Sequence, residues 1–138
     1  MHKSVVRVLI VDDFTEWRQV IRGIVSGMPQ VEIAGEAANG LEAVEKAQQL
    51  QPDLILLDIG IPGLNGIEAA RQIAKVCPKS KIAFLTENRC YELVEEALQV
   101  GASGYILKSH FDSELISGVA AMLKGKQFVS HAMVRSPR

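Results

Sequence analysis

The stretch "LILLDIG", from Leu54 to Gly60, is the part of the sequence that decides the fold prediction. It begins with consecutive aliphatic residues, Leu54–Leu57, and such unbroken apolarity is typical of a central strand that is covered on both faces. Strands of that kind belong to parallel sheets flanked by helices. The run then ends on a carboxylate, Asp58, which has no packing use in a buried strand. The sequence therefore raises two questions, namely which sheet contains this strand and what Asp58 does at its end.

Four similar runs accompany this strand at regular intervals. The five runs are "VVRVLIV" (Val5–Val11), "VEIAGEA" (Val31–Ala37), "DLILL" (Asp53–Leu57), "KIAFL" (Lys81–Leu85) and "SGYIL" (Ser103–Leu107). Their starts lie 26, 22, 28 and 22 residues apart, which leaves room for one helix and two short loops in each interval. This alternation predicts βαβ units in a parallel sheet. The second run contains Glu32 and Glu36, so we expect it at an edge.

The segments between the runs have helical periodicity and helix start signals. Apolar residues that share one predicted helix face are Trp17, Val20, Ile21 and Ile24, then Ile67, Ala70, Ala74 and Cys77, then Phe111, Leu115, Val119 and Met122. "NGLE" (Asn39–Glu42) and "NGIE" (Asn65–Glu68) each place an asparagine at an N-cap with a glutamate three residues later. We therefore predict a doubly wound α/β fold with a five-stranded parallel sheet and helices on both faces.

Length and composition favour one domain. The chain has 138 residues with 15 basic and 16 acidic side chains, and this balance argues against nucleic-acid binding by the domain itself. The N-terminus has neither a signal peptide nor a membrane span, so we expect a cytoplasmic protein without a membrane partner. Cys77 and Cys90 lack metal-ligand spacing and are expected to be free thiols. We assign residues 1–125 to the domain, and the aperiodic residues 126–138 to a tail or the start of a linker.

Polar residues follow four of the five predicted strands. Asp12 and Asp13 follow the first, Asp58 the third, Thr86 the fourth and Lys108 the fifth. Because ligands of open parallel sheets bind outside the carboxyl ends of the strands, these residues are expected to share one rim. An aspartate after a strand is also a common helix N-cap, and Asp13 could form such a pair with Glu16.

This set of groups suits phosphoryl transfer. Three neighbouring carboxylates repel one another unless a cation joins them, and hard oxygen ligands suit Mg²⁺. Lys108 supplies a charge for a phosphate-like anion, and the Thr86 hydroxyl can donate to a phosphoryl oxygen. Asp58 stands between the other groups, where a carboxylate can act as a nucleophile and form an aspartyl-phosphate.

Two rival functions fit the same fold less well. A flavin-binding flavodoxin-like module would need a first loop rich in glycine and hydroxyl groups, whereas this loop is "DDF". A magnesium-dependent phosphatase of the haloacid-dehalogenase type would need a second aspartate two residues after the first, where this chain has Gly60.

The motifs match those of a known family. "VLIVDDF", "LILLDIGIPGLNGIEAARQI", "IAFLTE" and "GASGYILKS" resemble the receiver domain of bacterial two-component response regulators, over roughly Val5 to Lys124. The resemblance implies the flavodoxin/CheY-like (βα)5 fold with strand order 2-1-3-4-5. "GASGYILKS", with no proline after the lysine, is most similar to the NarL/FixJ subfamily, whose members usually carry a LuxR-type helix-turn-helix output domain.

The resemblance also implies roles around the metal and the phosphoryl group. Asp58 would accept a phosphoryl group from the phosphohistidine of a partner histidine kinase. Asp13 and Asp58 would bind Mg²⁺ directly, Asp12 would assist through water, and the Gly60 carbonyl would complete the protein ligands. Lys108 would pair with the phosphoryl group.

A second set of implied roles concerns switching and output. Thr86 would move inward to hydrogen-bond the phosphoryl group, and Tyr105 would change rotamer with it. These shifts would remodel the face formed by the fourth helix, fifth strand and fifth helix, and could drive homodimerisation. The resemblance implies a signalling switch and not a turnover enzyme, with transcription as the expected output of a longer protein. A stand-alone receiver that acts through protein contacts or a phosphorelay is the alternative.

Three residues depart from the family pattern near the site. Gly60 stands where many relatives carry a side chain, but a backbone carbonyl ligand needs none. Position 109 is Ser, so the cis lysine–proline bond of many receivers is not expected. Glu87 follows Thr86, where the family usually has a small residue. We hypothesise that Glu87 narrows the access to Asp58, repels anionic donors and slows phosphorylation.

Overall fold

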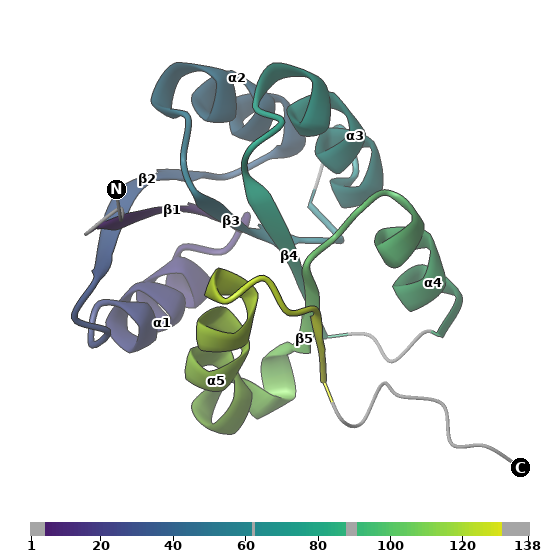
Figure 1. Ribbon diagram of the computed structural model, residues 1–138. Coiled ribbons are helices and arrows are strands. Elements are labelled where there is room, and N and C mark those ends of the chain that lie inside the picture. The colour runs from purple at the N-terminus through teal and green to yellow at the C-terminus, as the bar shows by residue number, and fades with distance from the viewer. Residues whose placement is uncertain (1–4, 62, 88–90, 131–138) are drawn as a thin grey trace, which may run out of the picture.

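The computed structural model describes residues 5–61, 63–87 and 91–130. Its centre is a parallel sheet in the order β2-β1-β3-β4-β5-β6 (Figure 1). The strands are β1 (Val6–Val11), β2 (Val31–Ala37), β3 (Leu54–Asp58), β4 (Lys81–Thr86), β5 (Gly104–Leu107) and β6 (Phe128–Val129). The predicted order of the first five strands is confirmed, including the edge position of β2.

Helices cover both faces of this sheet. They are α1 (Thr15–Val25), α2 (Gly40–Leu50), α3 (Gly66–Val76), α4 (Tyr91–Gln99) and α5 (Phe111–Leu123), and the short 3-10 helix η1 (Lys108–His110) leads into α5. Figure 1 shows α1 and α5 on one face and α2, α3 and α4 on the other. The doubly wound α/β prediction is therefore confirmed.

The core consists of two layers, one on each side of the sheet. Successive strand residues alternate between them: Leu54 and Leu56 belong to the layer under α1 and α5, whereas Ile55 and Leu57 belong to the layer under α2, α3 and α4. Every residue of β3 is buried, which explains its unbroken apolar run. Because side chains of a strand alternate between faces, a strand covered twice must be apolar at each position.

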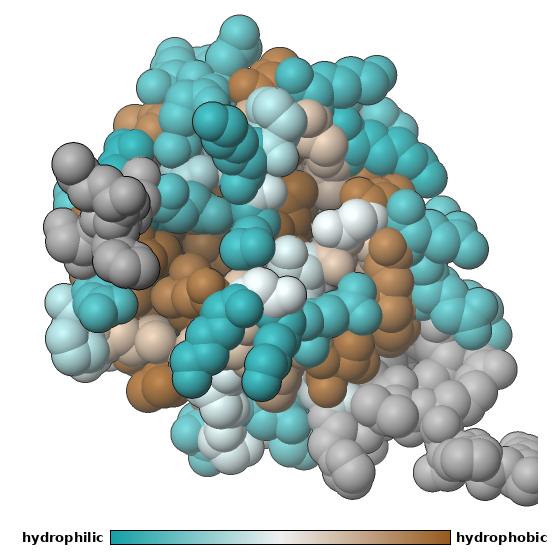
Figure 2. Space-filling model, in the orientation of Figure 1, coloured by the Kyte–Doolittle hydropathy of each residue, from teal (hydrophilic) through white to brown (hydrophobic). Residues whose placement is uncertain are grey.

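The exposed surface is mixed. Polar and charged residues cover most of the face drawn in Figure 2, with apolar patches between them. Within the described part of the chain, no helix combines the length and the apolarity that crossing a membrane requires.

The predicted helix starts are confirmed at both asparagines. Asn39 Oδ1 accepts the backbone N–H of Glu42 at 2.9 Å, and Asn65 Oδ1 accepts that of Glu68 at 3.0 Å. The Glu42 carboxylate reaches back to the N–H of Ala38 at 2.6 Å. The two asparagine bonds satisfy donors that the first turn of a helix leaves without an intrahelical partner, and the Glu42 bond satisfies the N–H just before the N-cap of α2.

For two residues, the predicted position on the buried face of a helix is wrong. Val20 is 46% exposed and Ala74 is also exposed, while Ile73 is buried in α3. Both lie at the margin of the apolar stripe of their helix, where a spacing of three or four residues permits either orientation. The stripe of α5 is confirmed, since Phe111, Leu115, Val119 and Met122 are all buried.

The sheet has one strand more than the five predicted, because part of the expected tail packs on the domain. Phe128 and Val129 form β6, which runs parallel to β5. The N–H of Phe128 donates to the Ser103 carbonyl at 3.0 Å, and the N–H of Ser130 donates to the Tyr105 carbonyl at 2.8 Å. A two-residue strand is too short to show periodicity, so no sequence pattern predicts it. Residues 131–138 of the predicted tail lie outside the described residues.

Gly66, the first residue of α3, lets that helix begin directly against the end of β3. A Cβ atom at this position would lie 2.6 Å from Ile59 Cα, 2.8 Å from the Ile59 carbonyl oxygen and 3.0 Å from the Asp58 carbonyl oxygen. All three are backbone atoms that follow or belong to β3, so no flexible side chain can give way. Gly66 therefore fixes how closely α3 approaches the segment that carries Asp58.

We expect Gly66→Ala to lower the free energy of unfolding by about 1–3 kcal/mol, the usual cost of overpacking. Urea denaturation of the two proteins measures the difference. Gly23→Ala is the matched control, because Gly23 lies in α1 with no atom within 4 Å of an added Cβ. This control should gain up to about 1 kcal/mol from helix propensity. Equal stabilities of Gly66→Ala and the wild type would contradict the close approach.

Candidate functional site

The strand register brings the predicted site residues to one rim of the sheet. Val11 pairs with Leu57 across β1 and β3, so the residues that follow, Asp12 and Asp58, come side by side. Thr86 pairs with Leu107 across β4 and β5, which places Lys108 next to Thr86. The convergence predicted from the strand ends is therefore confirmed. Parallel strands in register end at the same edge, and the side chains beyond those ends meet there.

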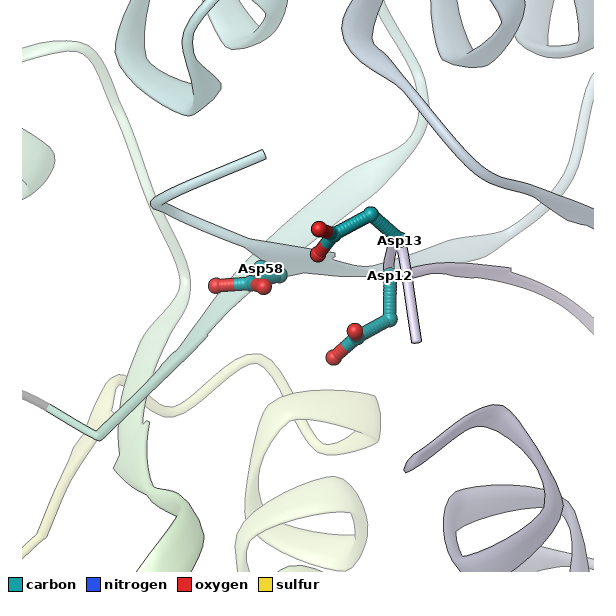
Figure 3. A group of neighbouring side chains, drawn as sticks. All are labelled: Asp12, Asp13 and Asp58. Atoms are coloured by element: carbon teal, nitrogen blue, oxygen red, sulfur yellow. The ribbon is translucent and has the colours of Figure 1, made fainter. Parts of the chain in front are cut away.

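Three carboxylates gather at this rim. Asp12 and Asp13 follow β1 and Asp58 ends β3, and Figure 3 shows the three side chains gathered at these neighbouring strand ends. One oxygen from each lies within 4.8 Å of the others. Asp12 and Asp58 are buried, whereas Asp13 is exposed. This donor set fits a hard cation such as Mg²⁺, which takes oxygen ligands and keeps several waters, because the exposed Asp13 leaves an open side.

The buried ammonium of Lys108 neutralises part of this negative charge. Its Nζ lies 2.5 Å from Asp12 Oδ2 and 3.4 Å from Asp58 Oδ2, and the residue is only 5% exposed. Asp12 also accepts the backbone N–H of Phe14 at 2.9 Å through its other oxygen. Both oxygens of Asp12 are therefore engaged within the protein, whereas the contact of Asp58 with Lys108 is long.

A cavity of about 200 Å³ opens beside these groups. It is lined by Asp13, Phe14, Asp58, Gly60, Thr86, Glu87 and Lys108. The backbone N–H of Gly60 donates to Asp58 Oδ1 at 3.0 Å. Thr86, Gly60 and Lys108 thus share one cavity with Asp58, as predicted. Tyr105 is fully buried in β5 and does not line the cavity.

The environment of Asp58 raises the pKa of its carboxyl group above the ordinary value. Burial is the main cause, because the charged form loses its water, and the Asp12 carboxylate acts in the same direction. The Gly60 N–H and the Lys108 ammonium act in the opposite direction without cancelling the effect. A cation beside Asp58 would remove much of this penalty.

The alternative role for Asp13, capping of α1, is not found. The helix begins at Thr15, its N-cap residue is Phe14, and no side chain caps it. Helix capping, which would compete with metal binding, therefore does not engage the Asp13 carboxylate.

One residue near the site was predicted only as a core residue. The indole Nε1 of Trp17 donates to Glu87 Oε1 at 3.2 Å, and Lys108 Nζ lies 4.8 Å from the centre of the Trp17 ring. The ring also meets Phe111 edge to face at a centroid distance of 5.5 Å. Helical periodicity placed Trp17 on the inner face of α1 correctly, but it carries no signal for a contact with Glu87, seventy residues away.

Comparison with known proteins gives the family. Residues 8–120 match the protein family described as "Response regulator receiver domain". The chain belongs to this family. Receiver domains generally bind Mg²⁺ at an acidic cluster of aspartates, and Asp12, Asp13 and Asp58 form such a cluster here.

Relatives of this receiver domain include regulators of transcription. It is 36% identical over 126 residues to the uncharacterized transcriptional regulatory protein YxjL of Bacillus subtilis, a match that covers 91% of this chain and 58% of YxjL. It is also 38% identical over 118 residues to the chemotaxis protein CheY of Thermotoga maritima, covering 86% of this chain and 98% of CheY. The chain therefore spans little more than half of the first relative.

A solved structure supports the same assignment. A two-component response regulator of the LuxR family from Aurantimonas superposes on the receiver domain with a TM-score of 0.89 at 31% identity. The match covers 94% of this chain and 93% of that one. The expected similarity to LuxR-type response regulators is thereby confirmed.

The raised pKa of Asp58 predicts a stability effect of Asp58→Asn. A carboxyl group whose pKa rises on folding makes the folded state less stable once the pH exceeds the pKa of the unfolded chain. At pH 7, Asp58→Asn should therefore unfold at a higher urea concentration than the wild type. The difference should shrink as the pH falls below the unfolded-state pKa, where the carboxyl group is protonated in both the folded and the unfolded state.

Asp12→Asn is the contrasting variant for this measurement. It removes the 2.5 Å partner of the buried Lys108 ammonium, so it should lower the urea midpoint at pH 7, because a buried charge left without its close partner is costly. A lower midpoint for Asp58→Asn than for the wild type at pH 7 would contradict the assigned cause.

Proposed function

We propose that the chain is a phosphorylation switch in which Asp58 accepts a phosphoryl group from a sensor histidine kinase. The observation that carries the proposal is the arrangement of Asp58, which lines an open cavity with Thr86 while the buried Lys108 ammonium lies 3.4 Å from its carboxylate. Membership of the receiver family supports the same role.

The reaction assigned to Asp58 is a direct displacement at phosphorus. One carboxylate oxygen forms the new P–O bond, the P–N bond to the donor histidine breaks, and the imidazole nitrogen leaves with the electron pair of that bond. A carboxylate is an adequate nucleophile only when the incoming phosphoryl charge is neutralised. The N–H of Gly60, bonded to Asp58 Oδ1 at 3.0 Å, holds the carboxylate in a fixed orientation.

Lys108 and Thr86 would stabilise the transferred group. The Lys108 ammonium contacts Asp12 closely and Asp58 only at 3.4 Å, so it can shift its hydrogen bond to a phosphoryl oxygen while it keeps Asp12 as a counter-charge. The Thr86 hydroxyl borders the same cavity and can donate to another phosphoryl oxygen.

The carboxylates would hold Mg²⁺. Asp13 and Asp58 would be direct ligands, Asp12 would act through water, and the Gly60 carbonyl would complete the protein ligands. When bound, the ion supplies positive charge for the phosphoryl oxygens. Asp13 is exposed and uncommitted to helix capping, which suits a ligand that must admit both the ion and its waters.

We propose transcription as the output. YxjL carries the description of a transcriptional regulatory protein and the Aurantimonas structure that of a LuxR-family regulator. Movement of Thr86 and Tyr105 after phosphorylation would change the face formed by α4, β5 and α5 and could drive homodimerisation. DNA binding would reside in a further domain of the full protein. The alternative is a stand-alone receiver that acts through protein contacts or a phosphorelay, and the match to 98% of CheY supports it.

Incubation with acetyl phosphate and Mg²⁺ should add one phosphoryl group to the wild type, because Asp58 is the proposed nucleophile. Intact-mass spectrometry measures the gain. Asp58→Asn should gain nothing, and chelation of Mg²⁺ should abolish the gain of the wild type.

An equal mass gain in wild type and Asp58→Asn would contradict the assignment, as would a wild type that gains nothing. A generic phosphate ester serves as the second substrate, since a switch that modifies itself should not turn it over. Sustained release of phosphate from that ester would favour the phosphatase function instead.

A further inference from the structure

Trp17 makes three contacts around the site, and the proposed phosphoryl transfer uses none of them. Its Nε1 donates to the carboxylate of Glu87 at 3.2 Å, its ring lies 4.8 Å from Lys108 Nζ, and the edge-to-face contact with Phe111 fixes the ring. Trp17 comes from α1 and Glu87 follows β4. The hydrogen bond therefore joins two elements that meet at the rim of the cavity.

Glu87 lines the cavity that contains Asp58, but Trp17 does not. The Glu87 side chain is exposed, and an exposed glutamate without a partner samples many rotamers, most of them in solvent. The Trp17 N–H removes that freedom and holds the carboxylate at the rim. The indole, itself fixed by Phe111, thus determines where the negative charge of Glu87 is placed.

The placed charge matters because the rim is already acidic. One carboxylate oxygen each from Asp12, Asp13 and Asp58 lies within 4.8 Å of the others. Among the residues that line the cavity and that the structure describes, Lys108 is the one basic residue that opposes them. Glu87 adds a further carboxylate to the lining of the same cavity. Every phosphodonor is an anion, so a fixed carboxylate there raises the energy of its approach.

We propose that Trp17 and Glu87 form a bridge at the rim of the cavity beside Asp58 that disfavours the approach of phosphodonors and slows phosphorylation, with Trp17 as the positioning residue. This inference rests on the proposed role of Asp58 as phosphoacceptor. It goes beyond a charge at position 87, because it makes the effect of that charge depend on the indole N–H.

The chain permits the parts of the bridge to be removed one at a time. Glu87→Ala removes the carboxylate, Glu87→Gln keeps an acceptor for the N–H without the charge, and Trp17→Phe keeps a ring against Lys108 and Phe111 without the N–H. Glu95→Ala is the matched control, because Glu95 is exposed on α4 and does not line the cavity.

Rates of phosphorylation by acetyl phosphate with Mg²⁺ test the bridge. Glu87→Ala and Glu87→Gln should react about fivefold faster than the wild type at low salt, the size of one charge interaction near a protein surface. The ratio of each variant's rate to the wild-type rate should fall toward one at about 1 M salt, where the Debye length is only about 3 Å. Trp17→Phe should react about twofold faster than the wild type at low salt, and Glu95→Ala should react at the wild-type rate.

A double-mutant cycle separates the bridge from a general effect of Trp17 on the fold. Trp17→Phe should have no effect once Glu87 is alanine, because the N–H then has no carboxylate to hold. Equal rates for wild type and Glu87→Ala would overturn the proposal. So would an effect of Trp17→Phe that is the same with and without Glu87.

Fluorescence provides a readout that needs no phosphorylation. Trp17 is the only tryptophan of the chain, so its emission reports this site alone, and Glu87→Ala should change the emission whereas Glu95→Ala should not. An emission spectrum unaffected by Glu87→Ala would overturn the bridge. A wild type that no donor phosphorylates, with emission that does respond to Glu87→Ala, would instead refute the proposed function and the kinetic role built on it.

Discussion

The buried ion pair of Lys108 with Asp12 is the interaction on which the site depends. Its two charges come from residues 96 positions apart, at the ends of β5 and β1, and lie 2.5 Å from each other. Leaving one partner of such a pair buried alone costs about 3–5 kcal/mol. The pair therefore ties the register of the sheet to the charge balance of its rim, since a shift of either strand would separate the charges. Asp58 lies between the two strands, on β3, and its exposure, orientation and pKa follow from that position.

Much of this arrangement could be predicted because it depends on simple periodicities. The five apolar runs and their spacing determine a parallel sheet, and in such a sheet the residues after the strands converge. The sequence alone therefore predicts the grouping of Asp12, Asp13, Asp58, Thr86 and Lys108. The capping asparagines were predictable for a similar reason, because an N-cap is a local device that three or four residues specify.

The features that escaped prediction are short or depend on distant contacts. Strand β6 has two residues and is held by bonds to Ser103 and Tyr105, so its own sequence could not reveal it. The orientation of Val20 depends on how far α1 is rotated against the sheet, which packing determines. The contact between Trp17 and Glu87 requires the relative positions of α1 and the end of β4, and the indole N–H has no partner that a local pattern could suggest.

Strand β6 also bears on where this domain can be cut. Without residues 126–130, the backbone N–H and C=O groups along the outer side of β5 would become an open sheet edge, and such edges pair with other chains and promote aggregation. Gly118 would add an apolar hollow, because it leaves room for the Phe128 ring, which lies 3.0 Å from where a Cβ atom would be. Ser130 closes the segment by donating to Glu114 and accepting the N–H of Leu107. A domain ended at Gly125, where the helical pattern stops, would therefore be a less soluble molecule than one that ends after Ser130.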